Sequence, residues 1–323
     1  MVIDEKRNSM KNATFFNVDG MRYAITSSAN KTCKVSRANL ELVGEVVLPD
    51  MVEYDGQMYA VTGIECGAFK NQRGLTGLVL PKGVRRIGSS AFAGCIALMR
   101  MVIPEGVNGV RWHTFFGCSS LKEVILPEGL MAIENEAFDD CCMLKSLTIP
   151  SSVVYIGERV FSGCCNLEHF SVAEGNVHFD SRNDCQAIIS TQSNSLLYGC
   201  SKTVIPQDVT IIRSNAFCSC GLLEHIMIPD GVYTIDACAF SYCHNLKKVS
   251  IPSTVSSIGN WTFENCSSLT ALSYEGTKAQ WEMVIKGRGW NASVPASCIQ
   301  CTDGPADLPD PHDWIGFSLR ARW

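Results

Sequence analysis

Residues 87–107, IGSSAFAGCIALMRMVIPEGV, contain one complete copy of a sequence frame that recurs along the chain. The frame runs Ile-Gly, Ala-Phe, Gly-Cys, Leu, two alternating apolar residues, Pro and Val. Its phenylalanine returns every 23 residues, with one longer interval, at Phe69, Phe92, Phe115, Phe138, Phe161, Phe217, Phe240 and Phe263. A fixed period of about 20 to 50 residues is typical of a solenoid, in which each repeat is stabilised by its stacked neighbours. The period therefore predicts a repeat solenoid and argues against an enzyme pocket.

Each repeat is predicted to contribute one short strand to a parallel sheet. In residues 98–104 the alternation places Met101 and Ile103 inward and Arg100 and Val102 outward. Proline cannot donate to a sheet ladder, so Pro104 marks the corner where the chain leaves the sheet. The Ile-Gly-x-x-Ala-Phe half is expected to form the opposite wall from tight turns or short 3-10 segments.

Both ends of the repeat array carry capping signals. Residues 14–26, TFFNVDGMRYAIT, and 51–64, MVEYDGQMYAVTGI, each place Asp-Gly between alternating residues, which predicts two β-hairpins. Residues 277–280, TKAQ, form a capping-box pattern that predicts a short helix with Trp281, Val284 and Ile285 on one face. We expect Trp281 and Trp290 to cover the last coil.

These signals divide the chain into five parts. Phe161 and Phe217 lie 56 residues apart, about ten more than two periods of 23, so one unit in this interval carries about ten extra residues. We predict a disordered lead over 1–14, an N-terminal hairpin cap over 15–60 and the solenoid over 61–276, with the enlarged unit at about 171–208. A C-terminal cap follows over 277–304, and 305–323 is expected to be a loose tail.

The composition narrows the class of protein. The chain is 46% hydrophobic and 18% charged, which suits a folded protein. Lys and Arg number 27 against 32 Asp and Glu, a net charge of -5 that argues against a nucleic-acid surface. No apolar run approaches the roughly 18 residues that span a bilayer. Residues 1–14 also lack the apolar core of a secretory signal, so we expect no signal peptide in this chain: either the protein stays inside the cell or the sequence begins after its signal.

The repeat explains the positions of some of the 17 cysteines. Seven of them follow the repeat phenylalanine by three residues: Cys95, Cys118, Cys141, Cys164, Cys220, Cys243 and Cys266. Equivalent residues of adjacent coils lie about 4.8 Å apart, so these thiols form an inward column, where a free Cys acts as a small hydrophobe. We expect them to be reduced, although that spacing also permits disulfides, including one between Cys142 and Cys165.

The frame IGxxAFxxCxxLxxxxIP resembles the BspA-like leucine-rich repeat family of bacterial surface proteins. The stretch DSRNDCQAIISTQSNSLLYGC at 180–200, the VDG-x-x-Tyr start and GTKAQWEMVIKGRGW before CTDG resemble the versions found in gut Bacteroidales. The resemblance covers about residues 15–304. It implies a leucine-rich-repeat solenoid, a location at the cell surface or outside the cell, and adhesion to a host or bacterial surface protein or glycan.

Outward strand positions supply the candidate partner-binding residues. They form two columns on the sheet face. The first column changes from apolar to hydroxyl-bearing residues along the solenoid, and the second carries the charged and titratable groups. The candidates are Val79, Arg100, Val102, Glu123, Ile125, Thr148, His169 and His225. Contiguous exposed apolar surface often marks an interface. The alternative is that β-branched residues simply suit an exposed sheet.

Three further sequence patterns are weak indications of a metal site, a disulfide or a catalytic thiol. His169 and His225 fall in one column and invite a metal site, but the enlarged unit separates them. Residues 298–301, CIQC, have the spacing of zinc or disulfide sites, yet a single CxxC is weak evidence. Cys243 beside His244 suggests a thiol nucleophile, but neighbouring residues on a coil point different ways. We therefore expect no catalytic residue, no metal and no cofactor.

The leading hypothesis is a non-enzymatic recognition or adhesion protein, a monomer that binds a protein or glycan through its solenoid surface. It involves neither nucleic acid nor a membrane span. The first alternative is a structural envelope protein or self-assembling scaffold. A thiol-based enzyme is the remote alternative.

Overall fold

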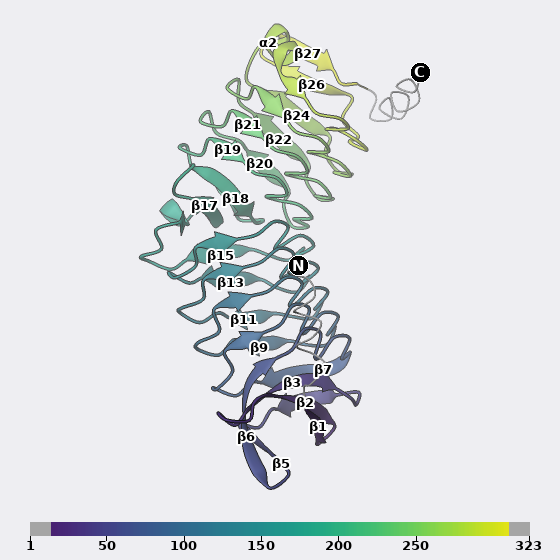
Figure 1. The fold of residues 1–323 in the computed structure, drawn as a ribbon. Helices are drawn as coiled ribbons and strands as arrows, with labels where there is room; N and C mark the ends of the chain where they lie inside the picture. The colour runs from purple at the N-terminus through teal and green to yellow at the C-terminus, as the bar shows by residue number, and fades with distance from the viewer. Residues whose placement is uncertain (1–13, 310–323) are drawn as a thin grey trace, which may run out of the picture. The chain divides into compact units, whose positions relative to one another are not determined.

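The computed structural model describes residues 14–309, which form two compact units. Within this range, unit 1 comprises residues 14–141 and 155–160, and unit 2 comprises residues 142–154 and 161–309. The predicted lead over 1–14 and tail over 305–323 lie largely outside the described residues. Nearly all the regular elements of each unit are short strands, which turns connect (Figure 1).

A wide parallel sheet forms one wall of unit 1, with strand order β11-β9-β7-β4. Its members are β4 (Val43–Val47), β7 (Gly74–Val79), β9 (Arg100–Val102) and β11 (Glu123–Ile125). Met101 and Ile103 are buried while Arg100 and Val102 are exposed, as their alternation predicted. The outward residues of successive coils consequently stand in rows, since Arg100 pairs with Glu123 and Val102 with Ile125.

The opposite wall of unit 1 is a narrow parallel sheet rather than turns alone. It contains β10 (Gly109–Val110), β12 (Ala132–Ile133) and β14 (Tyr155–Ile156), each followed by turns. The glycine of the Ile-Gly pair lets this wall pack closely. A Cβ added to Gly88 would lie 2.4 Å from the backbone nitrogen of Cys66 in the preceding coil. Side-chain atoms cannot be accommodated at that distance.

The N-terminal region of unit 1 forms a mixed sheet of order β1-β2-β3-β6-β5, with β8 paired to β6. Its strands are β1 (Phe15–Val18), β2 (Met21–Ser27), β3 (Thr32–Ala38), β5 (Met51–Tyr54), β6 (Gln57–Ile64) and β8 (Arg86–Ile87). Both predicted hairpins are confirmed: β1 pairs antiparallel with β2 and β5 with β6 across the two Asp-Gly turns. The sequence analysis missed β3, and β6 runs across the boundary predicted at residue 60.

Unit 2 has the same two kinds of wall. Its wide parallel ladders comprise the pair β13 (Ser146–Ile149) and β15 (His169–Val172), and then β20 (His225–Met227), β22 (Lys248–Ile251), β24 (Ala271–Tyr274) and β26 (Cys298–Cys301). The narrow parallel ladder contains β19 (Ile211–Ile212), β21 (Thr234–Ile235), β23 (Ser257–Ile258) and β25 (Ile285–Lys286). The repeating frame therefore produces the same coil in both units.

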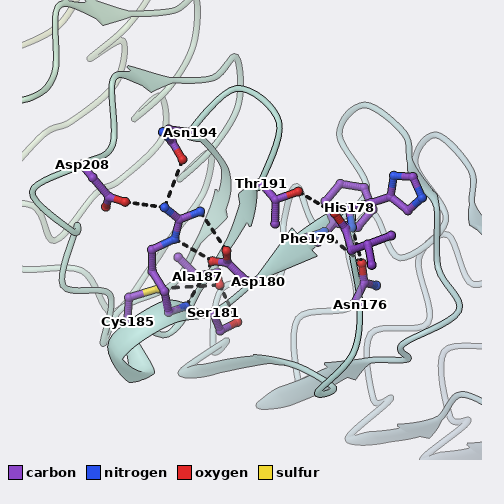
Figure 2. A network of polar contacts seen from close by, with 12 residues as sticks. Asn176, His178, Phe179, Asp180, Ser181, Cys185, Ala187, Thr191, Asn194 and Asp208 are labelled. Atoms are coloured by element: carbon purple, nitrogen blue, oxygen red, sulfur yellow. Dashed lines mark hydrogen bonds and ion pairs between the residues drawn. The ribbon is translucent and has the colours of Figure 1, made fainter.

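The enlarged repeat in unit 2 folds as strands and turns, as predicted. It contains β16 (Phe179–Asp180), the 3-10 segment η1 (Arg182–Asp184), β17 (Ala187–Ser190) and β18 (Ser195–Gly199), which pairs with β19. Arg182 holds this insertion together. Its guanidinium donates to both carboxylate oxygens of Asp180, at 2.9 and 2.8 Å, and also to Asn194 and Asp208 (Figure 2).

The C-terminal cap follows the predicted design with two corrections. Helix α2 (Lys278–Met283) begins after Thr277, which forms the capping box with Gln280, and Trp281 is buried against Trp290. Ile285, however, is 71% exposed and lies in β25, because the helix ends before it. The second correction concerns the predicted tail: Pro305–Asp307 belong to β27 (Gly304–Asp307), which pairs antiparallel with β26.

The repeat phenylalanines form stacked columns inside each unit. In unit 1 the ring centroids of Phe69 and Phe92 lie 5.6 Å apart, and those of Phe92 and Phe115 lie 5.4 Å apart, with nearly parallel planes. In unit 2, Phe217, Phe240 and Phe263 stack in the same way at 4.9 and 5.3 Å. These distances are close to one strand spacing, about 4.8 Å, so ring stacking and strand pairing share one period.

Candidate functional site

A shallow groove of about 860 Å³ lies on the wide sheet of unit 1. Val79, Val102 and Ile125 line its apolar side. Val47 on β4 continues this row beside the groove, and the four residues Val47, Val79, Val102 and Ile125 are 68%, 46%, 44% and 41% exposed. Val47 pairs with Val79, and Val102 pairs with Ile125. Four exposed aliphatic side chains in one row are the kind of contiguous apolar surface that protein interfaces use.

A second row of outward residues carries charges, and its members Glu45, Gly77 and Arg100 line the groove. It runs Glu45, Gly77, Arg100 and Glu123 in strand register. Arg100 Nε donates to Glu123 Oε2 at 2.7 Å, with both side chains more than half exposed. Exposed pairs of this kind contribute only about 0 to 1 kcal/mol to stability. The ion pair therefore adds little to the stability of the sheet.

Gly77 lies in the lining of the groove. Because this position has no side chain, the charged row is interrupted between Glu45 and Arg100. A Cβ added at Gly77 would lie 3.2 Å from Cγ of Glu45. Oε1 of Glu45 would lie 3.5 Å from the same Cβ, so the flexible Glu45 side chain lies over this position.

The structure brings five of the eight candidate residues together and places the other three in unit 2. Val79, Arg100, Val102, Glu123 and Ile125 occupy adjoining strands of one sheet in unit 1. Thr148 lies on β13 and hydrogen-bonds the Ser171 hydroxyl at 2.8 Å, while Nδ1 of His169 on β15 lies 3.1 Å from the Gln186 amide oxygen. His225 lines a different hollow of about 520 Å³ that also includes Met227.

Sequence reasoning missed the first strand of the groove. Glu45 and Val47 lie on β4, before the first repeat phenylalanine, so the search for the Ala-Phe frame passed over them. A usable signal was present, because residues 47–49, VLP, repeat residues 79–81 of the next coil. Aligning strand exits instead of aromatic residues would have placed Val47 in the exposed row.

The cysteine column uses its thiols as hydrogen-bond donors. Sγ of Cys95 lies 3.1 Å from the Phe69 carbonyl oxygen, and Sγ of Cys118 lies 3.2 Å from that of Phe92. In unit 2, Cys243 donates to Phe217 at 3.0 Å. Burial raises the pKa of the Cys95 thiol from 9.0 to about 12 and raises the pKa of Cys243 well above its ordinary value. These thiols remain protonated near neutral pH, which disfavours nucleophilic chemistry.

The weaker chemical patterns are separated by the fold. Cys243 is fully buried whereas His244 is exposed, so the two side chains lie on opposite sides of the coil wall. Cys298 and Cys301 lie on strand β26 at an odd spacing, which directs their side chains to opposite faces of the sheet. That geometry fits neither a local disulfide nor a two-cysteine zinc corner.

No helix within residues 14–309 has the length and apolar character needed to cross a bilayer. In the same range, no three or more His, Cys, Asp or Glu residues gather as a metal site.

The repeat region of the chain is similar in sequence and structure to known proteins. A sequence model described as BspA type leucine rich repeat region matches residues 62–185 and 190–281, with 6 copies. A solved leucine-rich repeat protein from Bacteroides ovatus is 27% identical, with a TM-score of 0.66 over 89% of this chain and 71% of that one. No curated protein shows significant sequence similarity to this chain.

Two more distant structures share the fold alone. The pneumococcal vaccine antigen PcpA is 16% identical, with a TM-score of 0.65 over 90% of this chain and 88% of that chain. A leucine-rich repeat protein from Eubacterium ventriosum is 19% identical, with a TM-score of 0.50 over 81% and 72% of the two chains.

Proposed function

Because the chain belongs to the BspA-type leucine-rich repeat family, as its sequence frame predicted, we propose that it is a non-enzymatic recognition protein whose unit 1 groove binds a segment of a protein partner. The observation that carries the proposal is the row of four exposed aliphatic residues beside the interrupted charged row. Leucine-rich repeat proteins generally act by binding other proteins, and an extended repeat surface offers many shallow contacts.

The groove suits an extended peptide segment with alternating side chains. Its aliphatic row would bury small apolar groups, and each buried methylene is worth about 0.8 kcal/mol. Arg100 and Glu123 would add orientation, since charged groups at an interface contribute more to specificity than to affinity.

We also propose that the protein acts at the cell surface or outside the cell as an adhesin, on a host or bacterial surface protein. The thiols of the cysteine column are free and donate hydrogen bonds, which supports a fold that needs no disulfides, whether at the cell surface or outside the cell. Monomeric action follows from a binding surface contained within unit 1. Light scattering at micromolar concentration tests this point, because the alternative of a self-assembling scaffold requires oligomers.

A partner-independent selection tests the groove. Random peptides displayed on phage are selected against the full chain and then measured against Arg100→Glu combined with Val102→Asp. All of these side chains are exposed, so the double variant folds normally. We expect the selected peptides to lose binding to it.

The matched control is Met227→Asp, a residue 77% exposed at the equivalent strand position in unit 2. It should leave peptide binding unchanged. Selected peptides that bind the double variant as tightly as the natural chain would remove the groove from consideration.

A further inference from the structure

Unit 1 has a hollow of about 440 Å³ on its narrow-sheet wall, separate from the groove on its wide sheet. Trp112, Glu134, Asn135 and Tyr155 line it. Trp112 is 47% exposed and Tyr155 is 50% exposed. These two aromatic residues come from coils two apart, so the strand spacing separates their backbones by roughly 10 Å.

Trp112 is exposed but held in place. Its ring stacks on His113 with 3.8 Å between centroids, and His113 packs against Phe116 at 4.7 Å. The backbone N–H of Trp112 donates to Glu134 Oε2 at 2.9 Å. A large apolar ring fixed in this way loses little conformational entropy when a ligand covers it.

Asn135 supplies a neutral polar group next to the rings. Its Oδ1 accepts hydrogen bonds from the backbone N–H of Glu158 at 3.0 Å and from the Tyr155 hydroxyl at 3.4 Å. These bonds fix the amide plane, and Nδ2 donates to no other described residue. Gly157 makes the arrangement possible, since a Cβ there would lie 2.3 Å from Asn135 Oδ1.

The charges around the hollow are already paired. Arg111 Nη1 donates to Glu134 Oε1 at 2.7 Å, and His113 Nε2 contacts the carboxylate of Glu136. An aromatic pair beside a carboxylate would otherwise favour a cation. Because Arg111 compensates Glu134, the hollow favours a neutral ligand. The Glu134 oxygens still have lone pairs that can accept further hydrogen bonds.

We propose that this hollow binds a neutral pyranose ring of a glycan. The C–H face of a sugar ring packs against the negative face of an aromatic ring, which Trp112 and Tyr155 both provide. Ring hydroxyls accept from Asn135 Nδ2 and donate to Glu134. Two half-exposed aromatic rings and two hydrogen-bonded polar side chains line this one hollow, which is the usual composition of a small-ligand site. The site lies on the other wall from the groove, so it does not depend on the proposed function.

The test is binding of the full chain to an array of neutral gluco-, galacto-, manno- and N-acetylglucosamine oligosaccharides, followed by calorimetry on those bound. Trp112→Ala and Tyr155→Ala each remove a half-exposed ring and should weaken binding about tenfold or more. Tyr233→Ala is the matched control, because Tyr233 is 46% exposed on unit 2. It should bind as the natural chain does.

Choline and N-acetylarginine amide serve as cationic probes in the same calorimeter. The proposal is overturned if no neutral oligosaccharide binds, if binding is equal in the Trp112→Ala variant, or if only the cations respond. The Arg100→Glu and Val102→Asp double variant should keep its sugar binding, which separates failure of this site from failure of the groove.

Discussion

The thiol of Cys118 donates a hydrogen bond to the carbonyl oxygen of Phe92 across 3.2 Å, joining one coil to the coil before it. The same carbonyl accepts the backbone N–H of Cys95 at 3.1 Å. A cysteine three residues after the phenylalanine therefore does two things, filling a small buried space and tying adjacent coils. This dual role explains why the column contains cysteine rather than alanine or valine.

Replacing Cys118 with alanine should lower the free energy of unfolding by about 1 to 2 kcal/mol, because it removes a fully buried sulfur and the bond between coils. Urea unfolding followed by circular dichroism measures the change. Cys66→Ala is the control, since Cys66 is exposed and should be neutral. Equal stability of the Cys118→Ala variant and the natural chain would contradict this role for the thiol.

Stability should fall in alkaline solution because of the buried thiols. Burial raises the pKa of Cys95 from 9.0 to about 12, so the folded state favours the protonated form. This contribution is fully present below pH 9 and is lost as the pH rises through 12. By pH 11 the loss should reach about 2 to 3 kcal/mol for this one group.

The measurement is the difference in unfolding free energy between pH 8 and pH 11 for the natural chain and for Cys95→Ala. Tyrosines and lysines titrate in both proteins, so their effect cancels. A Cys95→Ala variant that loses as much stability as the natural chain would show that this thiol carries no such linkage.

Asp139 should destabilise unit 1 at neutral pH. Burial, reinforced by the negative charge of Asp140, raises its pKa from 3.8 to about 6, although Arg159 at 3.6 Å opposes the shift. The protonated form is therefore favoured, and its contribution is present below pH 3.8 and lost as the pH rises through 6. Asp139→Asn should raise stability by about 1 to 3 kcal/mol at pH 8 and leave it unchanged at pH 4. Thermal unfolding at the two pH values checks this, and an equal gain at both would refute the assignment.

A large side chain at Gly77 should block the groove without unfolding the protein, because Gly77 lies in the groove lining. A leucine there meets Glu45 first, at the flexible Cγ rather than at backbone. We expect Gly77→Leu to keep its circular dichroism spectrum and lose the peptides selected by the natural chain. Gly88→Ala is the contrasting variant, since its Cβ meets backbone at 2.4 Å and should lower stability by about 1 to 3 kcal/mol. Unaltered peptide binding by Gly77→Leu would place the recognition surface elsewhere.

The sequence was sufficient to predict the coil. A 23-residue period with Phe92 and Cys95 inward, alternation around Met101 and proline at the strand exit dictate one arrangement of each repeat. The two Asp-Gly turns and the Thr277 capping box are equally local signals, and both are confirmed. Such features depend on residues close in the chain, where spacing determines geometry.

Features that depend on tertiary context were harder to predict. Strand β4 lacks the Ala-Phe frame, so the groove was predicted without Glu45 and Val47. Ile285 fits the apolar face of a helix, but the chain turns into β25 before reaching it. Pro305 and Asp307 read as a tail, yet β26 supplies a partner strand. The hydrogen bond from Cys118 to Phe92 depends on the distance between coils, which spacing alone does not give.

Hydrogen exchange tests the central claim that the unit 1 groove recognises protein segments. The full chain is labelled with and without a peptide selected from the phage library, and protection is mapped to individual strands. We predict that the peptide slows exchange in β7, β9 and β11 and leaves β20, β22 and β24 unchanged. The effect should be absent in the Arg100→Glu and Val102→Asp double variant. Protection confined to unit 2, or unchanged by the double variant, would contradict it.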